Sequence, residues 1–273
     1  SIELRGKSFL WADDLSSYDS IVNLPFSIPF YGDHVSLFAL LMAVSLFGYS
    51  YFNYQQTASS QPQMAGMKFM MVYLMPVMML LWFNSYSSGL TYYYFLANIL
   101  TIGQTLVIRR MIDEGHTVAI HGYSHDYASI YKSDEAFMQN VYRLRDRLRA
   151  DFGYEATILR FPGGSSNTVS RQYSVGIMSR LAQRVQNEGF TYFDWNVSSG
   201  DAAGTPASSG RIYSAVTSAL RHGRSNVVLM HDAGTKSTTA DALPDIIQYC
   251  LANGYSIQAI TPATKPVHHG IAN

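Results

Sequence analysis

The sequence has few charged residues, no excess of either sign of charge and almost no cysteine. Only 14% of its 273 residues are charged, compared with about 25% in an ordinary soluble domain. Lysine plus arginine and aspartate plus glutamate each number 19, so we expect no nucleic-acid partner, because no net positive field is available to bind one. Cys250 is the single cysteine, which excludes an intramolecular disulfide framework and a cysteine-rich zinc site.

Charge is nearly absent from one long part of the chain. Between His34 and Ile108 the only Lys, Arg, Asp or Glu is Lys68. Three apolar stretches lie there: Val35–Phe52, Phe69–Phe83 and about residues 89–108. Spanning a bilayer takes about 20 helical residues, so we expect three transmembrane helices, the second only if its ends are included. The lipid bilayer is then a partner of the chain.

The alternative for these stretches is three buried helices of a soluble protein. A soluble domain rarely leaves three consecutive helices without polar faces, so the membrane interpretation is favoured. Arg109 and Arg110 directly follow the third stretch, and positive residues favour the cytoplasmic side. We therefore expect whatever follows them to be cytoplasmic.

From Asp113 onward charges recur every few residues, and strand-like and helix-like segments alternate. We place a domain boundary within residues 111–116, which gives a membrane region over residues 1–113 and an α/β domain over residues 114–273. The alternation predicts a parallel sheet or a distorted (β/α) barrel. The expected strands are His116–Ile120, Thr157–Phe161, Phe190–Phe193, Asn226–His231 and Tyr255–Ile260, and the expected helices are Asp134–Phe152, about 173–188, about 209–221 and about 239–252.

Three groups of polar residues follow these expected strands, where active sites of such folds lie. His121 and His125 could hold one divalent ion, or they could be ordinary loop histidines. Arg160 could orient a carboxylate, whereas the glycines after it could simply form a turn. His231 could act in proton transfer or only cap backbone carbonyls.

The order and spacing of these groups resemble the polysaccharide deacetylase family (NodB homology, carbohydrate esterase family 4) over about residues 114–262. The resemblance rests on His121-x3-His125, Arg160-Phe-Pro-Gly-Gly164, Trp195-Asn-Val and Leu229-Met-His231. It implies a metal-dependent hydrolase that removes acetyl groups from N-acetylglucosamine units of peptidoglycan or chitin-like polymers. The metal, Zn²⁺ or a similar ion, would polarise the acetamide carbonyl and activate water.

The resemblance also implies roles for individual residues. His121 and His125 would bind the metal, and His231 would be the general acid that protonates the leaving amine. Arg160 would orient the catalytic base. Trp195 would lie at the substrate. Three positions depart from the family pattern: Gly163 replaces an aromatic residue, although its amide could still face the oxyanion, and Ser198 and Ala202 stand where the family often has Asp and Trp, so Asp201 could instead tune His231.

One departure from the family affects the expected activity. The family's first motif, an Asp-Asp pair that supplies the catalytic base and a third metal ligand, has no counterpart before His116. Asp13 and Asp14 lie beyond the three expected spans. The (β/α) barrel is therefore expected to be truncated and any activity impaired, because a positioned base contributes about 10²–10⁴-fold.

The first part of the chain resembles a different family, the bacterial YidC/Oxa1 membrane insertases, over about residues 1–113. The matching runs are Glu3-Leu4-Arg5, Trp11 with Asp14-Leu15-Ser16, Pro62-Gln63-Met64, Met75-Pro76-Val77-Met78, Ser88-Gly89-Leu90 with Tyr93-Tyr94, and Asn98 with Thr101-Ile102 and Gln104. The resemblance implies the last three spans of an insertase in a bacterial inner membrane.

The two resemblances together predict a chimera. Deacetylases of this family act on polymers outside the cytoplasm, whereas the charge pattern places the α/β domain inside. The rival interpretations are a natural membrane-anchored deacetylase, an insertase fragment, and a membrane protein with an inert soluble tail. Two smaller expectations are that Cys250 lies in a helix core and that His268 and His269 form a solvated tail.

Overall fold

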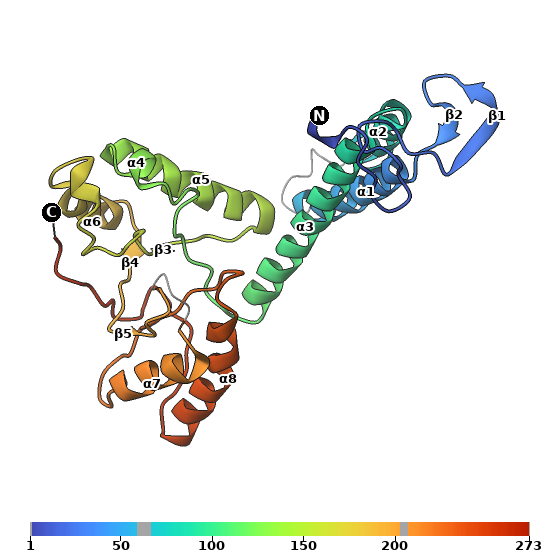
Figure 1. The fold of residues 1–273 in the computed structure, drawn as a ribbon. Helices are drawn as coiled ribbons and strands as arrows, with labels where there is room; N and C mark the ends of the chain where they lie inside the picture. Colours follow the sequence, from blue (N-terminus) through green and yellow to red (C-terminus); the bar gives the residue numbers. More distant parts are fainter. Residues whose placement is uncertain (1, 59–66, 203–206, 273) are drawn as a thin grey trace. The chain divides into compact units, whose positions relative to one another are not determined.

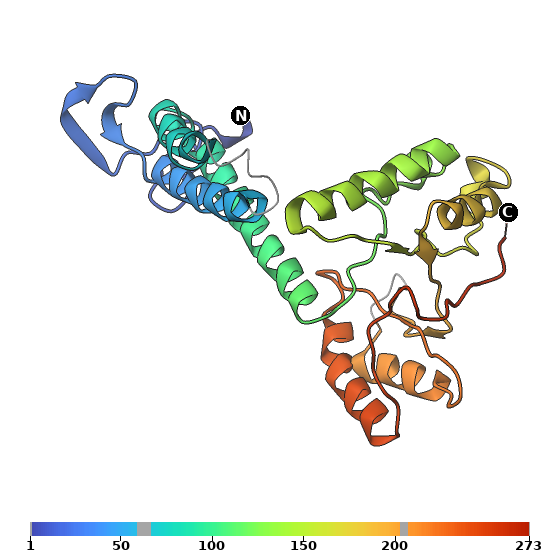
Figure 2. The ribbon, with the colours of Figure 1, turned by 180° about the vertical axis from the view of Figure 1, so that it is seen from behind.

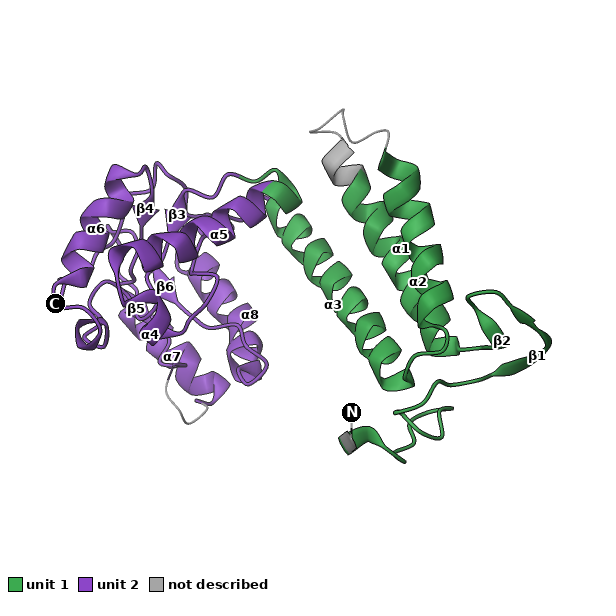
Figure 3. Cartoon of the chain, turned by 90° about the horizontal axis from the view of Figure 1, so that it is seen from above, with its two compact units in different colours: residues 1–113, 150–154 green, residues 114–149, 155–273 purple. Residues whose placement is uncertain are grey.

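The computed structural model describes residues 2–58, 67–202 and 207–272. The chain divides into two units, residues 1–113 with 150–154 and residues 114–149 with 155–273 (Figure 3). Each unit is described by itself below.

The first unit is helical apart from one hairpin. After a 3-10 turn, η1 (Ile2–Leu4), strands β1 (Val22–Ile28) and β2 (Gly32–Val35) pair antiparallel (Figure 1). The hairpin was not expected from the sequence. The helices that follow are α1 (Leu37–Ala58), η3 (Phe69–Leu74), α2 (Met75–Phe83) and α3 (Ser88–Asp113), and α1 packs against both α2 and α3.

Two of the three expected spans are long and apolar enough to cross a membrane. They are the segment Leu37–Tyr54 of α1 and the helix α3 itself. The remaining apolar segment, Phe69–Phe83, which is the second along the chain, is helical but shorter. None of the apolar window of α3 is buried and 28% of that of α1 is, so these helices are not the covered core of the unit that contains them.

A proline shapes the shorter apolar segment. Pro76 lies in the first turn of α2, and the segment before it, η3, is a π-helix. Proline lacks an N–H and its ring clashes with the carbonyl four residues earlier. In the wider π-turn the Met75 amide donates to the Met70 carbonyl. The helical path therefore continues through Pro76 without a break.

The second unit alternates short strands and helices (Figures 1 and 2). Its strands are β3 (Ile158–Leu159), β4 (Thr191–Tyr192), β5 (Val197–Ser198) and β6 (Val228–Leu229). Its helices are α4 (Tyr127–Ile130), α5 (Asp134–Phe152), η4 (Ser170–Gln172), α6 (Ile177–Asn187), α7 (Ser209–Ala219) and α8 (Ser237–Ala252). β3 pairs parallel with β4, and β5 pairs parallel with β6.

The expected strands at the two ends of this unit are not formed as predicted. His116–Ile120 contributes one parallel bridge, from Ile120 to Leu159, and Tyr255–Ile260 contains no strand. The two segments meet where the Thr117 hydroxyl donates to the Ile260 carbonyl. A strand needs a hydrogen-bonding neighbour along its length, and one side-chain contact does not supply it.

The apolar core of the second unit lies between its helices and strands. Val197, Val216 and Ile246 join β5, α7 and α8 in one cluster, which also contains the thiol of Cys250. A second group stacks aromatic rings, with Phe137 against Phe161 and Phe161 against Tyr192. These cores fix the strand ends from which the predicted site residues emerge.

Candidate metal and catalytic site

The pairing of Ile120 with Leu159 brings the first two motifs together. The Ile120 amide donates to the Ile158 carbonyl at 2.8 Å, and the Arg160 amide donates to the Ile120 carbonyl at 2.9 Å. His121 and Arg160, the next residue on each segment, are therefore neighbours. Nδ1 of His121 lies 2.9 Å from the Arg160 carbonyl oxygen, and Nη2 of Arg160 lies 3.4 Å from Nε2 of His121.

His125 lies beside His121. The two ring centroids are 5.2 Å apart, with the ring planes at 62°. A carbonyl oxygen can only accept, so Nδ1 of His121 carries the proton, and Nε2, which faces the Arg160 guanidinium, is the acceptor in the neutral ring. This is the tautomer that metal-bound histidine uses.

The electrostatic surroundings keep His121 neutral. Burial, together with the smaller effect of the positive charges of Arg160, His125 and His231, lowers the pKa of His121 to about 4, against the opposing effect of the hydrogen bond to the Arg160 carbonyl.

His231 is held by a buried carboxylate. Nδ1 of His231 lies 2.8 Å from Oδ1 of Asp201, and the His231 amide donates to Oδ2 at 2.7 Å. The Asp201 side chain is only 2% exposed, whereas that of His231 is 35% exposed. Burial alone would raise the pKa of Asp201, but hydrogen bonds, mainly from His231 and Ser199, outweigh it and lower the pKa to about 2.

The glycine turn after Arg160 is closely covered by side chains. Gly163 and Gly164 both have φ of +78°, a conformation that favours glycine. A Cβ at Gly163 would lie 2.6 Å from the Tyr127 hydroxyl, and one at Gly164 would lie 2.9 Å from the ring of Trp195. Gly163 itself is exposed.

The imidazoles of His121 and His125 are the side chains that could bind a divalent ion here. Two imidazoles lie together, and His121 has the tautomer that leaves Nε2 as an acceptor, which fits an ion of the zinc type. Among the residues that the structure describes, no group of three or more His, Cys, Asp or Glu side chains could hold a metal. The described residues thus provide two imidazole ligands at this site and no carboxylate beside them.

Several residues near the site were not expected from the sequence. The ring of Tyr127 lies 5.4 Å from that of His125. Asp194 is buried and accepts hydrogen bonds from the Ser165 amide and the His269 amide at 2.8 and 2.9 Å. Because tyrosine and aspartate occur at many positions in any sequence, only the spatial arrangement identifies these two.

The expectation of a solvated histidine tail was wrong for His269, which is partly buried, whereas His268 is exposed but bound to the unit. Nε2 of His269 lies 2.6 Å from the Trp195 carbonyl oxygen, and the His268 ring stacks on Tyr192 at 3.9 Å. The Asp194 amide donates to the Val267 carbonyl. Residues 267–269 are thus bound to β4 and to the residues that follow it. These contacts join residues far apart in the sequence, so local composition does not reveal them.

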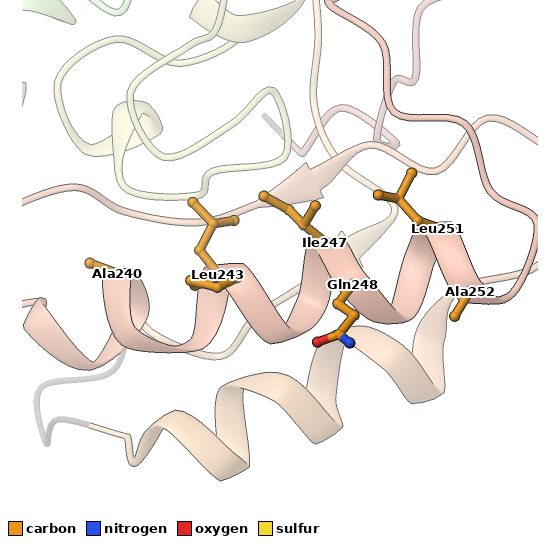
Figure 4. A pocket seen from close by; sticks show the side chains of 7 residues that line it. Ala240, Leu243, Ile247, Gln248, Leu251 and Ala252 are labelled. Atoms are coloured by element: carbon orange, nitrogen blue, oxygen red, sulfur yellow. The ribbon is translucent and has the colours of Figure 1, made fainter.

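A groove lies elsewhere, on the outer face of α8 (Figure 4). It has a volume of about 650 Å³ and is lined by Leu243, Ile247 and Leu251 among others. None of the predicted site residues lines it, so the groove is separate from the histidine site.

A solved structure resembles the second unit closely. It is the catalytic domain of a peptidoglycan N-acetylglucosamine deacetylase from Eubacterium rectale, 41% identical in sequence with a TM-score of 0.59. The match covers 62% of this chain and 76% of that one. The chain belongs to the polysaccharide deacetylase family. The family model described as polysaccharide deacetylase matches residues 84–177.

The first part of this deacetylase-family chain matches a second family. Residues 1–115 match the model described as 60Kd inner membrane protein. Membrane protein insertases YidC from Parabacteroides distasonis and Bacteroides fragilis are 50% identical over 123 residues and 52% identical over 115 residues, or 44% and 42% of this chain. The chain spans about a fifth of the length of these relatives, 19% and 18%.

The two family matches overlap over residues 84–115, the region that contains α3. The chain therefore joins segments of two families and is a chimera, as the two resemblances predicted.

Proposed function

We propose that residues 114–273 form a metal-dependent polysaccharide deacetylase-like hydrolase with impaired activity, attached to a membrane segment of residues 1–113. The substrate class is a polymer of N-acetylglucosamine such as peptidoglycan or a chitin oligomer. The observation that supports it is the presence of both a His121–His125 pair beside Arg160 and a His231–Asp201 pair, in a chain 41% identical to a peptidoglycan N-acetylglucosamine deacetylase.

Each site residue has a task in this proposal. His121 and His125 would hold the divalent ion, and His121 would do so through Nε2 without a change of tautomer. A bound ion of the zinc type supplies polarisation of the acetamide carbonyl and a more acidic water. His231, oriented by Asp201, would donate a proton to the leaving amine.

The remaining residues would bind and orient the substrate. The Arg160 guanidinium would interact with a carboxylate or with the acetyl group, Gly163 would present its amide to the oxyanion, and Trp195 would contact a sugar ring. No step in this scheme has an assigned base, because the family's Asp-Asp motif has no counterpart before His116.

The experiment is acetate release from chitooligosaccharides by the full chain in detergent with Zn²⁺, compared with the Eubacterium rectale catalytic domain. We expect measurable release that is about 10²–10⁴-fold slower, the contribution of a positioned base. The His231→Ala variant should release still less. Turnover equal to that of the complete enzyme would refute the impairment, and no release above the variant would refute the deacetylase function.

The second candidate is an insertase fragment or a membrane protein whose second unit is inert. The match of residues 1–115 to an inner membrane protein favours it, but the chain covers under a fifth of the insertases. The first candidate is better supported because the 41% identical relative is covered over 76% of its length. Absence of acetate release together with stable membrane insertion would favour the second.

A location in the bacterial inner membrane, with several spans, is part of the proposal. Arg109 and Arg110 near the end of α3 favour a cytoplasmic second unit by the positive-inside rule, whereas a functional deacetylase would need to be outside. We retain a boundary within residues 111–116 between the two regions.

A further inference from the structure

The loop that carries His121 and His125 is bound by a side chain from another element. Asn140, on α5, accepts a hydrogen bond from the Ser124 amide through Oδ1 at 2.7 Å, and its Nδ2 donates to the Ser124 carbonyl at 3.2 Å. One side-chain amide thus satisfies both backbone groups of a residue that lies between the two histidines.

The side-chain amide of Asn140 lies so close to the backbone of residue 122 that this residue has to be glycine. Gly122 has φ of +104°, and a Cβ there would lie 2.7 Å from Nδ2 of Asn140 and 2.9 Å from the Ser124 carbonyl oxygen. Contacts under 3.0 Å are essentially never seen for a real Cβ. Gly122 lets the loop approach α5 closely enough for Asn140 to bind it.

We propose that Asn140 is a positioning residue for the metal-binding loop, an inference that rests on the proposed function of His121 and His125. It would act through Ser124 and would touch neither metal nor substrate.

The need for such a residue follows from the exposure of the loop. Tyr123, Ser124 and His125 are all exposed, so little packing holds His125 at 5.2 Å from His121. His121 is already fixed by the Arg160 carbonyl, whereas within the part of the chain that the structure describes no backbone carbonyl holds the His125 ring in the same way. Binding one ion with both rings would otherwise require ordering the loop, which costs conformational entropy.

The expected size of the effect comes from metal sites in general. Removing a group that orients a metal ligand typically weakens metal affinity by 10–100-fold. Asn140 acts one residue away from the ligand, so we expect the lower end, about tenfold.

The test measures Zn²⁺ affinity of the full chain in detergent by competition with a chromogenic chelator. Asn140→Ala should weaken Zn²⁺ binding about tenfold. Gln139→Ala, on the exposed side of the same helix, is the matched control and should bind as the unaltered chain does. The milder Asn140→Asp keeps the acceptor for the Ser124 amide but loses the donor, and is compared with Gln139→Glu, which adds the same charge.

A second readout separates positioning from a merely structural role. The melting temperature of the metal-free chain should be similar for Asn140→Ala and Gln139→Ala, while their Zn²⁺ affinities differ. Equal Zn²⁺ affinities for these two variants would overturn the inference and leave the proposed function intact. Failure of the unaltered chain to bind Zn²⁺ would overturn the proposed function and the inference with it.

Discussion

Asp201 is the residue with the most consequential contacts in the second unit. Its carboxylate accepts hydrogen bonds from the His231 amide, the His231 ring and the Thr239 hydroxyl, which link the end of β6 to the start of α8. Hydrogen bonds to a charged group contribute more to stability than neutral ones. Asp201 therefore stabilises the fold besides orienting a site residue.

The first prediction concerns this carboxylate and pH. The pKa of Asp201 is about 2, below the ordinary value of 3.8, so its contribution is complete above pH 4 and is lost as the pH falls toward 2. Asp201→Asn should lower stability at neutral pH by about 1–3 kcal/mol and should flatten the melting temperature between pH 4 and 2. Melting curves from pH 2 to 7 measure this, with Asp232→Asn, an exposed neighbour, as the control. A variant that loses stability in acid as steeply as the unaltered chain would contradict the assignment.

The second prediction concerns the glycine turn. Gly164→Ala would place Cβ 2.9 Å from Trp195 and 3.2 Å from Oδ1 of Asp194, at a φ of +78°, so we expect a loss of about 1–3 kcal/mol. Gly210→Ala in α7, where a Cβ meets nothing within 4 Å, should be neutral or stabilising by up to about 1 kcal/mol. Thermal denaturation of both variants measures this difference in stability. Equal melting temperatures would show that the turn relaxes to accommodate the Cβ.

At this scale the sequence identified residues but not their partners. His121, His125, Arg160 and His231 were selected from motif spacing; the structure brings His121 beside His125 and Arg160, and it pairs His231 with Asp201. Asn140 could not be selected, because an asparagine within a helix carries no signal until its contact with Ser124 is seen. The Asp194 contact with the C-terminal segment crosses 75 residues, beyond any local pattern.

Helices were predicted far better than strands. The helix Asp134–Phe152 has the predicted bounds, because its amphipathic pattern is strong and the Ser133 hydroxyl accepts from the Ala136 amide as an N-cap. The four parallel strands are two residues each, shorter than their apolar runs. A strand depends on pairing with a neighbour, and the sequence of one strand does not specify how far its neighbour extends.

The third prediction concerns an element, α8. Pro244 lies inside this helix, where proline removes a hydrogen bond and clashes with the preceding turn. Pro244→Ala should therefore stabilise the second unit, by about 1–3 kcal/mol. Pro266→Ala, outside the helices, should change stability by less than about 0.5 kcal/mol. Equal melting temperatures for the two variants would show that the helix accommodates Pro244 without cost.

The whole molecule combines a membrane-type helix with a deacetylase-type unit. α3 belongs to both family matches, which explains why no Pro, Gly or Ser-rich linker marks the junction. The composition change near residues 111–116 was visible in the sequence because apolar helices and charged α/β segments differ so strongly. The composition change did not determine the number of transmembrane spans, because the segment Phe69–Phe83 is intermediate in length.

The fourth prediction concerns where the chain resides. If α1 and α3 span a bilayer, the chain expressed in bacteria should stay in the membrane pellet after alkaline carbonate extraction. Replacing Leu100 and Leu106, exposed on α3, with Lys should release it, because a charge at the centre of a span costs about 2.5–3.5 kcal/mol. Replacing Leu243 and Leu251, exposed on α8, with Lys is the control and should not. Release of the unaltered chain by carbonate would refute the membrane assignment.

The burial of Cys250 gives the molecule a natural reporter. As the sole thiol of the chain it is 8% exposed, on the face of α8 that packs in the same cluster as α7, so a water-soluble alkylating reagent can reach it only when the packing of α7 and α8 opens. The rate of its modification therefore measures how often that part of the protein fluctuates, without introducing a label elsewhere.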